Sequence, residues 1–588
     1  MQSLPVTVDK VGRKVTVVVT KGHYLWSQVS TAVRKVAAGG KGAFNEAQGR
    51  YEFGMAELDE ILRDLTPFGL DVGDALATWQ LQQAEAKQLE YAIPDAPEPW
   101  AKHQLEGILH ALRNTCSIIL DDQGLGKTRQ AGAAIYERIN MGAIKVCLVI
   151  CPNSVKTSWL KEMAHCFPDL RCAIFKKSMS KKGIPATVQV LIVNYEMVRY
   201  AHTMFVDWVG DDMAVLDEGH RIKSRPVLGV ENGKRVVVKG KTAWAINQLQ
   251  PRFRMVLSGT LVANRPEDVW FPINWAMNGF FPDYFTWLKQ IAKVGNAYSK
   301  TAIAEYKLAG LAMLREQMGR VSLRRLKSEV LDLPERTYQI RYVGMTNEQR
   351  VMYENARMGM LGDYLQAYAP GAAMSLDELQ SQGTSENPLA RMNALEKTLR
   401  MAQIAANPRL VGPEYPEVTL KYQEAIDLIE DCSGPVIVWT CYKYDQARMY
   451  QMLADVGIGA TIINGDVPVN LRSWYVDTWR RGEVKVLLAT PASYSEGVTL
   501  NEADTMIYIN RSWSHLHRSQ SQDRNYRMGQ TKSVTVYDIV VAGTVDELIL
   551  EALQRKADMM AYLQTETTSD PAIDQLIAEY LAKPATKE

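Results

Sequence analysis

Short runs of apolar residues alternate with helix-like stretches along most of the chain after residue 100. Five runs come first, namely SIIL, KVCLVIC, VQVLIVNY, MAVLD and RMVLS, and four more follow after residue 435, namely VIVWT, ATIIN, VKVLLAT and TMIYIN. Nearly continuous apolar strands separated by helices are typical of parallel sheets covered on both faces. The pattern therefore predicts two α/β domains.

A different pattern precedes residue 92. KVTVVVTKG reads as a β-branched strand, and YLWSQVSTAVRKV and MAELDEILRDL read as amphipathic helices. The stretch AIPDAPEPW, at 92–100, contains three prolines and predicts a linker. We therefore expect a small α+β module at 1–91, a first lobe at 92–338, a helical insertion with an exposed QSQGTSEN loop at 339–410, and a second lobe at 411–588.

Composition limits the classes of protein that fit. The chain has 588 residues, 47% of them hydrophobic, and a net charge of +1, so binding to a polyanion has to rely on local basic clusters. Seven cysteines without a C-x-x-C pair argue against a zinc module or a disulfide framework. The chain shows no signal-peptide pattern and no apolar run of the roughly 18 residues that a membrane span needs. We expect no membrane association and a cytoplasmic location in a bacterial or virus-infected bacterial cell, or a nuclear one in a eukaryote.

The stretch SIILDDQGLGKTRQ places a glycine-containing turn between a strand and a helix. Free backbone N–H groups and the positive end of the helix dipole make such a turn suitable for binding phosphate. Gly124 and Gly126 would form the loop, Lys127 would reach the β and γ phosphates, and Thr128 would bind Mg²⁺. Asp121 stands where the general phosphate-loop pattern has glycine, and an ordinary strand-to-helix turn remains an alternative for this motif alone.

A second motif, MAVLDEGH, ends an apolar strand with two carboxylates. Asp217 would bind the metal through its water shell, and Glu218 would orient or deprotonate the attacking water. An acidic pair at a strand end can also be a solvated tip. Together with the GKT turn, however, the pair predicts a site for ATP and Mg²⁺.

These motifs resemble those of the Swi/Snf-type helicase-like ATPases of superfamily two, which are built from two RecA-like lobes. In that family an aspartate is usual at the position of Asp121, as in DEMGLGKT, so the resemblance assigns Asp121 to the nucleotide site. By the same resemblance, HQLEGILHAL implies that Gln104 contacts adenine, and CPNSVKTSWLKE implies that Trp159 lies near the DNA path. LSGTLVANRPEDVW implies residues that couple ATP to the cleft: Ser258, Gly259 and Thr260.

The last matching motif is SQSQDRNYRMGQTKSVTVYDIV. The resemblance implies that Arg524 and Arg527 are arginine fingers from the second lobe and that Gln530 belongs to the nucleotide site. Residues three apart share a helical face, so both guanidinium groups are expected to point at one site. An arginine from across the cleft stabilises the charge on the γ-phosphate, and repeated closing and opening of the lobes would move DNA.

Two further stretches are candidate DNA contacts. SRPVLGVENGKRVVVKGK, at 224–241, predicts a hairpin turning at Asn232-Gly233, with Lys234 and Arg235 against DNA; a solvated loop is the alternative. Residues 33–65 resemble the HARP-type DNA-binding domain of the annealing-helicase branch. There Phe44, Tyr51 and Phe53 would stack on exposed bases or form core.

The expected function is an ATP-dependent double-stranded DNA translocase that acts in strand annealing or in fork and junction remodelling. The stretch ATPASYSEGVTLNEAD, at 489–504, resembles the annealing-helicase branch and favours this reading. Expected partners are double-stranded or branched DNA and a single-strand-binding protein, and the chain is expected to be a monomer. A strand-separating helicase and a nucleotide-sensing scaffold with negligible turnover are the alternatives.

Overall fold

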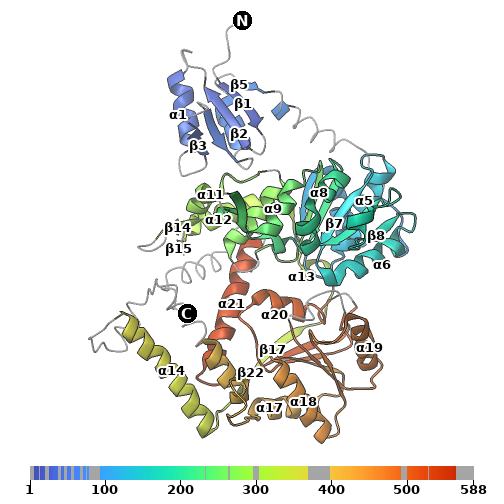
Figure 1. Ribbon diagram of the computed structural model, residues 1–588, viewed down its shortest axis with the longest axis vertical. Coiled ribbons are helices and arrows are strands. Elements are labelled where there is room, and N and C mark those ends of the chain that lie inside the picture. Colours follow the sequence, from blue (N-terminus) through green and yellow to red (C-terminus); the bar gives the residue numbers. More distant parts are fainter. Residues whose placement is uncertain are drawn as a thin grey trace. The chain divides into compact units, whose positions relative to one another are not determined.

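The computed structural model describes residues 6–11, 14–19, 26–37, 42–45, 50–54, 58–66, 70–73, 76–77, 93–231, 234–262, 265–277, 279–295, 303–368, 398–491, 499–527 and 529–564. The chain divides into two compact units (Figure 1). Unit 1 is built mainly from residues up to Val330, and unit 2 mainly from Leu331 to Met559.

The N-terminal part of unit 1 is a small α+β module, as the sequence predicts. Its sheet has the strand order β3-β4-β2-β1-β5, in which β1 pairs antiparallel with β2 and parallel with β5. The strands and helices are β1 (Val6–Val11), β2 (Lys14–Val19), α1 (Trp26–Ala37), β3 (Gly42–Asn45), β4 (Arg50–Phe53), α2 (Leu58–Leu65) and β5 (Leu70–Val72). Alternate valines of β1 and β2 are buried, which gives the module a core of its own.

The rest of unit 1 is organised around a seven-stranded parallel sheet of order β16-β6-β13-β10-β7-β9-β8. The strands are β6 (Cys116–Ile119), β7 (Cys147–Cys151), β8 (Cys172–Ile174), β9 (Val190–Asn194), β10 (Met213–Asp217), β13 (Phe253–Leu257) and β16 (Ser322–Leu323). The helices are α4 (Lys102–Arg113), α5 (Lys127–Asn140), α6 (Lys156–Cys166), α7 (Met179–Lys182), α8 (Tyr195–Val209), α9 (Lys241–Gln248), α10 (Trp270–Ala276), α11 (Tyr284–Ile291), α12 (Leu308–Val321) and α13 (Lys327–Val330).

Among the described residues, unit 1 also contains two hairpins and three short 3-10 helices. The antiparallel pairs are β11 (Val227–Glu231) with β12 (Lys234–Lys239), and β14 (Ala292–Val294) with β15 (Ile303–Tyr306). The 3-10 helices are η4 (Asn153–Val155), η5 (Gly219–Ile222) and η6 (Pro266–Val269). The predicted hairpin is therefore present, whereas its turn at 232–233 lies outside the described residues.

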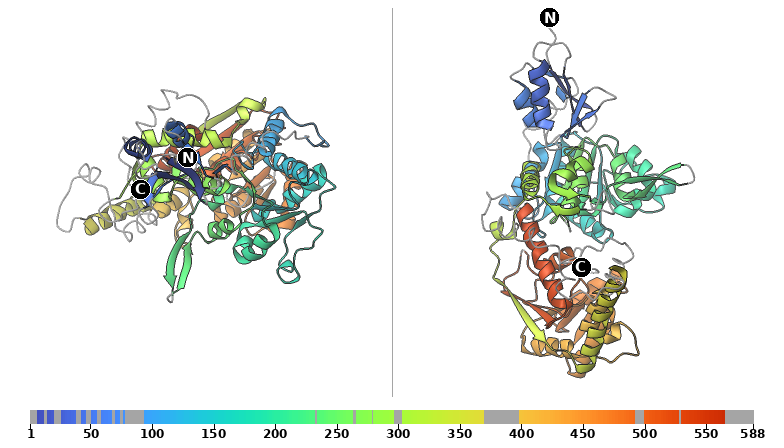
Figure 2. Two further views of the ribbon diagram at one scale, coloured as in Figure 1. Left: turned by 90° about the horizontal axis from the view of Figure 1, so that it is seen from above. Right: turned by 90° about the vertical axis from the view of Figure 1, so that its left-hand side faces the viewer.

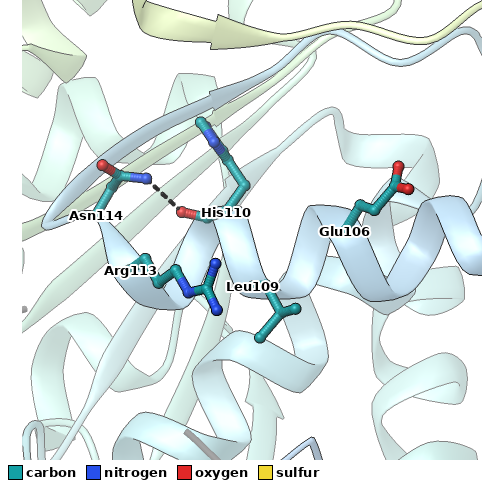
Figure 3. Close-up of a pocket in the computed structure, with 5 residues that line it drawn as sticks. All are labelled: Glu106, Leu109, His110, Arg113 and Asn114. Carbon is teal, nitrogen blue, oxygen red and sulfur yellow. Dashed lines mark hydrogen bonds between the residues drawn. The ribbon is translucent and has the colours of Figure 1, made fainter. Parts of the chain in front are cut away.

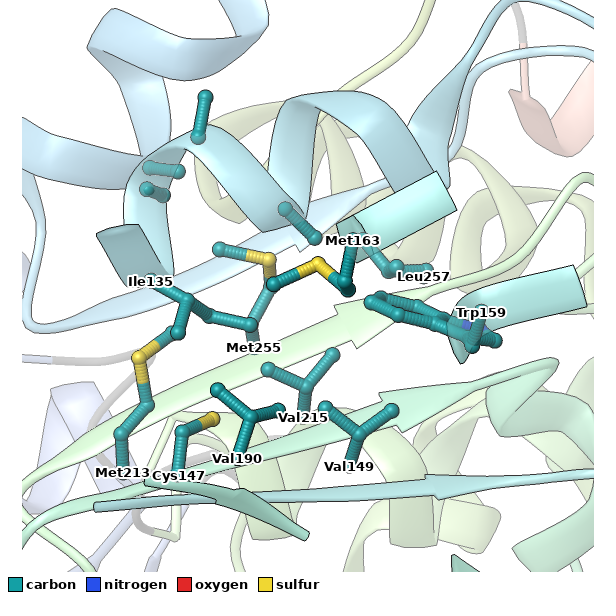
Figure 4. Close-up of a cluster of buried hydrophobic side chains, with 14 of the residues drawn as sticks. Ile135, Cys147, Val149, Trp159, Met163, Val190, Met213, Val215, Met255 and Leu257 are labelled. Carbon is teal, nitrogen blue, oxygen red and sulfur yellow. The ribbon is translucent and has the colours of Figure 1, made fainter. Parts of the chain in front are cut away.

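The core of the parallel sheet explains why its strands read as continuous apolar runs. Every residue of β7, β9, β10 and β13 is buried. Figure 4 shows Val149, Val215 and Met255 of three strands facing Trp159 and Met163 of α6. Close packing of this kind fixes the strand ends rigidly, so side chains that follow the strands are held in place.

Unit 2 has a second parallel sheet, of order β17-β22-β21-β18-β20-β19. The strands are β17 (Arg336–Val343), β18 (Val436–Trp439), β19 (Ala460–Ile463), β20 (Val486–Ala489), β21 (Thr505–Tyr508) and β22 (Val534–Val541). The helical elements are α14 (Asn347–Tyr368), η7 (Pro408–Leu410), α17 (Leu420–Asp431), α18 (Lys443–Asp455), α19 (Val469–Arg480), α20 (His515–Gln522) and α21 (Val545–Gln564). Helices α17 and α18 contribute to the core on one face, and α19 contributes on the other.

The fold class predicted from the sequence is confirmed: all nine apolar runs form strands, and they belong to two parallel sheets. The expected boundary at residue 339 falls inside β17, which belongs to the second sheet. Its sequence, RTYQIRYV, alternates polar and apolar residues because much of this edge strand is exposed, so it did not stand out as a buried run. The predicted QSQGTSEN loop lies outside the described residues.

The proline-rich stretch before α4 lacks helix and strand but is packed onto unit 1. Trp100 donates from Nε1 to the carbonyl oxygen of Pro94 at 2.8 Å, and the Arg129 guanidinium lies 4.5 Å from the centre of the Trp100 ring. Glu98 forms an ion pair with Arg129 at 3.2 Å. Residues 94–100 are therefore packed against the part of unit 1 that contains the parallel sheet, and they do not form a free linker.

Candidate functional site

The phosphate loop connects β6 to α5. Gly124 and Gly126 have φ angles of 91° and 77°, a left-handed conformation in which glycine is strongly favoured. Gly126 is the residue before the first turn of α5, so the loop presents the positive end of this helix. Thr128 follows in the first turn of α5 and is half-buried.

Lys127, the first residue of α5, and Gln104 of α4 both contact this loop. The Lys127 ammonium donates to the carbonyl oxygens of Asp121 at 2.6 Å and Asp122 at 3.1 Å. Gln104 is buried and accepts a hydrogen bond from Ala101 N, and a Cβ at Gly126 would lie 2.3 Å from its Nε2 atom. Helix α4 is therefore seated directly against the phosphate loop, while the contact of Gln104 with adenine stays a prediction.

Asp121 has a different position from the one expected of a nucleotide ligand. Its carboxylate is fully buried and accepts hydrogen bonds from Arg325 Nε at 2.9 Å and Nη2 at 2.5 Å, and from Gln130 Nε2 at 3.1 Å. Because these partners surround the carboxylate, the prediction that Asp121 binds the cofactor directly is wrong. Asp121 instead fixes the loop to Arg325, which also donates to the carbonyl oxygen of His103 in α4.

The acidic pair lies at the end of β10, of which Asp217 is the last residue. Asp217 accepts hydrogen bonds from Trp159 Nε1 at 2.7 Å and from the Glu218 backbone N–H at 3.0 Å. Burial, followed by the neighbouring charge of Glu218, raises the pKa of Asp217, while the Trp159 hydrogen bond and Lys127 act in the opposite direction. Glu218 itself has φ 53° and ψ 54°, a strained conformation for a residue with a side chain. Such strain is typical of functional sites.

Trp159 is therefore not a DNA contact in this structure. Its side chain is 1% exposed and is packed in the core of the sheet domain, with its indole N–H directed at Asp217 (Figure 4). Burial on all sides excludes direct contact with a DNA backbone. Trp159 orients one of the acidic residues, a role that no sequence signal distinguished from DNA binding.

Ser258, Gly259 and Thr260 follow β13, which lies between β6 and β10 in the sheet. Ser258 Oγ accepts from the Thr260 backbone N–H at 3.2 Å and lies 3.3 Å from His220 Nδ1, which is also 3.3 Å from Glu218 Oε2. The segment expected to couple ATP to the cleft thus reaches the acidic pair through His220. Sequence reading missed His220, although it is the last residue of the DEGH motif.

Arg324 is a second residue that sequence reading missed. It donates to the carbonyl oxygens of Leu120 at 2.9 Å and Gly259 at 3.3 Å, and forms an ion pair with Asp122 at 3.2 Å. Arg324 and Arg325 therefore hold the phosphate loop and the segment after β13 together. These contacts join Arg324 to residues between 65 and 204 positions away, so they could not be read from the sequence.

A pocket of about 540 Å³ lies elsewhere on unit 1, along α4 (Figure 3). It is lined by Glu106, Leu109, His110, Arg113 and Asn114, and Asn114 donates to the carbonyl oxygen of His110 at 2.7 Å. No residue predicted for the nucleotide site lines this pocket. Within the described ranges, no group of three or more His, Cys, Asp or Glu residues is arranged to hold a metal ion.

In unit 2, Arg524 and Arg527 follow α20 instead of lying on it. Helix α20 ends at Gln522, and both arginines are in the turn that comes next, so the expected shared helical face is wrong. Arg524 is buried, and Arg527 donates from Nη1 to Thr499 Oγ1 at 2.9 Å. Burial lowers the pKa of Arg527.

Gln530 is buried and its side chain is saturated inside unit 2. Its Nε2 donates to the carbonyl oxygens of Ala503 at 3.1 Å and Asn525 at 3.3 Å, and its Oε1 accepts from the Lys532 backbone N–H at 3.0 Å. The prediction that Gln530 binds the cofactor is therefore corrected: it closes the turn that carries Arg524 and Arg527.

The candidate DNA contacts are only partly described. Lys234 and Arg235 begin β12 of the predicted hairpin, and their side chains lie outside the description. In the N-terminal module, Phe53 is buried, whereas Phe44 is 51% exposed and its ring lies 4.9 Å from that of Tyr51. Phe53 is therefore core, and only Phe44 and Tyr51 are left as candidates for stacking on bases.

Comparisons with known proteins place this geometry in a family. Residues 100–410 match the SNF2-related domain, and residues 420–529 match the helicase conserved C-terminal domain. The TATA-binding protein-associated factor mot1 of Aspergillus fumigatus is 25% identical over 547 residues, which cover 82% of this chain and 27% of mot1. The uncharacterized ATP-dependent helicase YqhH of Bacillus subtilis is 24% identical over 512 residues, covering 82% of this chain and 84% of YqhH.

Two more similarities extend the picture. The mouse DNA annealing helicase and endonuclease ZRANB3 is 24% identical over 472 residues, covering 78% of this chain and 40% of ZRANB3. The Sulfolobus solfataricus SWI2/SNF2 ATPase core in complex with dsDNA is 21% identical, with a TM-score of 0.37, and the match covers 84% of this chain and 99% of that one. This chain thus spans only about a quarter of mot1 and two fifths of ZRANB3. Because the SNF2-related domain match alone covers more than half of the residues, the chain belongs to the SNF2-related family of helicase-like ATPases.

Proposed function

We propose that this chain is an ATP-dependent double-stranded DNA translocase that acts in strand annealing or in the remodelling of forks and junctions. The observation that carries the proposal is the convergence of three segments at one edge of the unit 1 sheet. Strands β6, β13 and β10 are parallel neighbours, so the phosphate loop, Ser258–Thr260 and the Asp217-Glu218 pair follow their carboxyl ends together.

The residues at this edge fit ATP and Mg²⁺. The left-handed glycines at 124 and 126 and the start of α5 suit a phosphate chain, and Lys127 supplies a cation that the loop carbonyls already hold in place. Thr128 and Asp217 would hold the metal, which when bound neutralises phosphate charge. The raised pKa of Asp217 is consistent with a carboxyl that gains a cationic partner on binding.

Individual side chains then have distinct roles in the proposed reaction. Glu218 is held near His220 and would orient the attacking water and accept its proton. Trp159 would keep the Asp217 carboxylate in one orientation through its N–H. Arg524 and Arg527 are proposed to stabilise the transferred phosphoryl group, the role that the family resemblance implies for them.

Double-stranded DNA as the track is supported by the relatives, whose names include a DNA annealing helicase, and by the basic ribbon β11–β12. Backbone binding of this kind depends on phosphate charge, so we expect little dependence on base sequence. A HARP-like role for the N-terminal module is proposed on Phe44 and Tyr51, which offer an aromatic surface for unpaired bases.

The deciding experiment measures ATP hydrolysis without DNA and with single strands, plain duplex and forked duplex. The proposal expects stimulation by duplex and forks, and a flat rate near zero with all four would favour the nucleotide-sensing scaffold instead. Annealing is then tested by reannealing of a DNA bubble coated with single-strand-binding protein, and unwinding by strand release from a fork. Strand release without reannealing would identify a strand-separating helicase.

A further inference from the structure

The β11–β12 ribbon exposes aliphatic side chains that no part of the proposed ATP cycle uses. The two strands form a sheet of their own, and Figure 2 shows the ribbon extending away from the parallel sheet of unit 1. Leu228 is 60% exposed, Val230 is 71% exposed and Val238 is 47% exposed. Three large aliphatic groups in water on so small an element are unfavourable unless they meet a partner.

Both faces of the ribbon carry these groups. Leu228 and Val230 are two residues apart on β11 and therefore share one face. A Cβ at Gly229 would lie 2.7 Å from Val238 Cγ1, so Val238 crosses the opposite face, and the missing side chain at Gly229 makes room for it. The ribbon thus exposes aliphatic side chains on both faces, unlike a sheet that buries one face against a core.

The root of the ribbon is anchored, which distinguishes it from a free loop. Before β11, Lys223 forms an ion pair with Asp268 at 3.4 Å, and Arg225 lies over the rings of Tyr284 and Phe285 at 4.7 and 4.6 Å. After β12, Gly240 has φ 68°, and a Cβ there would lie 2.4 Å from the carbonyl oxygen of Arg225. The two strands therefore leave the domain from a closed base, and the aliphatic groups are held outward.

The net charge of the ribbon indicates which class of partner binds it. From 223 to 241 the sequence has six basic residues and one acidic residue, Glu231. This excess of positive charge matches a polyanion, and aliphatic side chains between basic ones contact base faces rather than phosphates. Base faces are accessible only where a duplex ends, opens or forks. An acidic protein surface would match the charge but offers no reason for apolar groups on both faces.

We propose that the β11–β12 ribbon is a junction-reading wedge, in which Leu228, Val230 and Val238 contact unstacked bases where duplex DNA meets single strands. The inference rests on the proposed DNA translocase function and adds to it the DNA structure that the motor prefers. The ribbon follows η5 and the DEGH motif directly in the chain, so the wedge is covalently close to Glu218.

The test compares wild type with the triple variant Leu228→Thr, Val230→Thr, Val238→Thr. Threonine is β-branched and keeps the strand preference while it removes apolar surface. The matched control is Tyr200→Gln on α8, because Tyr200 is also 71% exposed and lies in the same unit. Val230→Thr alone serves as a milder variant, and thermal melting checks that each protein is folded.

Affinity is measured for plain duplex and for a fork that carries 2-aminopurine at the junction base. We expect wild type to prefer the fork and to raise 2-aminopurine fluorescence, and the triple variant to lose about five-fold or more of fork affinity with little change on plain duplex. Val230→Thr should change the same quantities in the same direction by less, and Tyr200→Gln should match wild type.

The other outcomes overturn the wedge. If the triple variant loses equal affinity for fork and duplex, the ribbon makes a general contact with the DNA backbone. If a folded triple variant keeps wild-type affinity for both DNAs, the aliphatic surface binds a protein instead. If wild type itself shows no DNA-stimulated ATP hydrolysis, the translocase proposal fails and the wedge fails with it. If DNA stimulates ATP hydrolysis by the wild type but the triple variant keeps its fork affinity, only the wedge proposal is refuted.

Discussion

Replacing Arg325 by methionine tests whether the phosphate loop depends on the buried ion pair with Asp121. Arg325 donates to both carboxylate oxygens of Asp121 and also to Gln130 Oε1 at 3.2 Å. Asp121 is 0% exposed, so loss of the guanidinium leaves a carboxylate without its counter-charge in the interior. Removing one partner of such a pair costs about 3–5 kcal/mol.

That cost is large against the stability of a domain, about 5–15 kcal/mol in total. For a domain of this size, 1 kcal/mol corresponds to about 2–4 °C in Tm, so Arg325→Met should lower the melting temperature of unit 1 by about 6–20 °C. Arg325→Lys keeps the charge but cannot make two parallel N–H···O bonds, so we expect a smaller loss. Because the same pair fixes the loop that holds Lys127, the apparent affinity for ATP should also fall.

Thermal unfolding is monitored by circular dichroism. ATP is then titrated at a temperature where every variant is folded. Arg320→Met is the matched control, because Arg320 forms an exposed i,i+4 pair with Glu316 on α12 and should cost less than about 1 kcal/mol. The double variant Asp121→Leu, Arg325→Met removes both charges and should recover much of the loss. A Tm within about 2 °C of wild type for Arg325→Met, or no recovery in the double variant, would refute the reasoning.

Three further predictions concern the nucleotide site and pH. Lys127→Ala should abolish ATP turnover because the loop loses its only cation for the β and γ phosphates, and phosphate release at the wild-type rate would contradict the assignment. Glu218→Gln should retain nucleotide binding while hydrolysis falls by about 100-fold or more, as measured by fluorescent nucleotide titration and single-turnover hydrolysis; loss of binding would argue for a purely structural role. Burial lowers the pKa of His515 from 6.5 to about 4, so the unfolded state takes up the proton first as pH falls. Unit 2 should therefore lose up to about 3 kcal/mol between pH 6.5 and 4, seen as a falling Tm that His515→Gln flattens; equal pH dependence in both proteins would show that His515 is not responsible.

The sequence placed the GLGKT and DEGH motifs correctly at strand ends because these elements are local. A strand that ends in GLGKT or in DEGH brings its functional residues with it, and parallel strand order then sets Lys127 and Asp217 at one edge of the sheet. Each motif can be placed at the end of its strand from local sequence, whereas the strand order that brings the two together depends on contacts between distant residues. Short, strongly patterned segments of this kind are where sequence reasoning is most dependable.

The corrections have one physical cause, which is that sequence shows residue type but not burial. Asp121, Trp159 and Gln530 are polar or amphipathic residues inside recognised motifs, and motif membership suggested direct contact with a ligand. In the structure each side chain is buried and forms its hydrogen bonds with other protein groups. Residues of this kind support a site by positioning others, and the contacts that reveal it join segments far apart in the chain.

The phosphate loop is also hydrogen-bonded to β16, the strand at one end of the unit 1 sheet, and to the residues that follow it. Leu120 N donates to the carbonyl oxygen of Leu323 in β16 at 2.7 Å, and Asp122 N donates to that of Arg325, two residues after this strand, at 3.1 Å. The chain passes to unit 2 at Leu331, only a few residues later. Any rearrangement of the loop around phosphate must therefore move β16 or break these bonds.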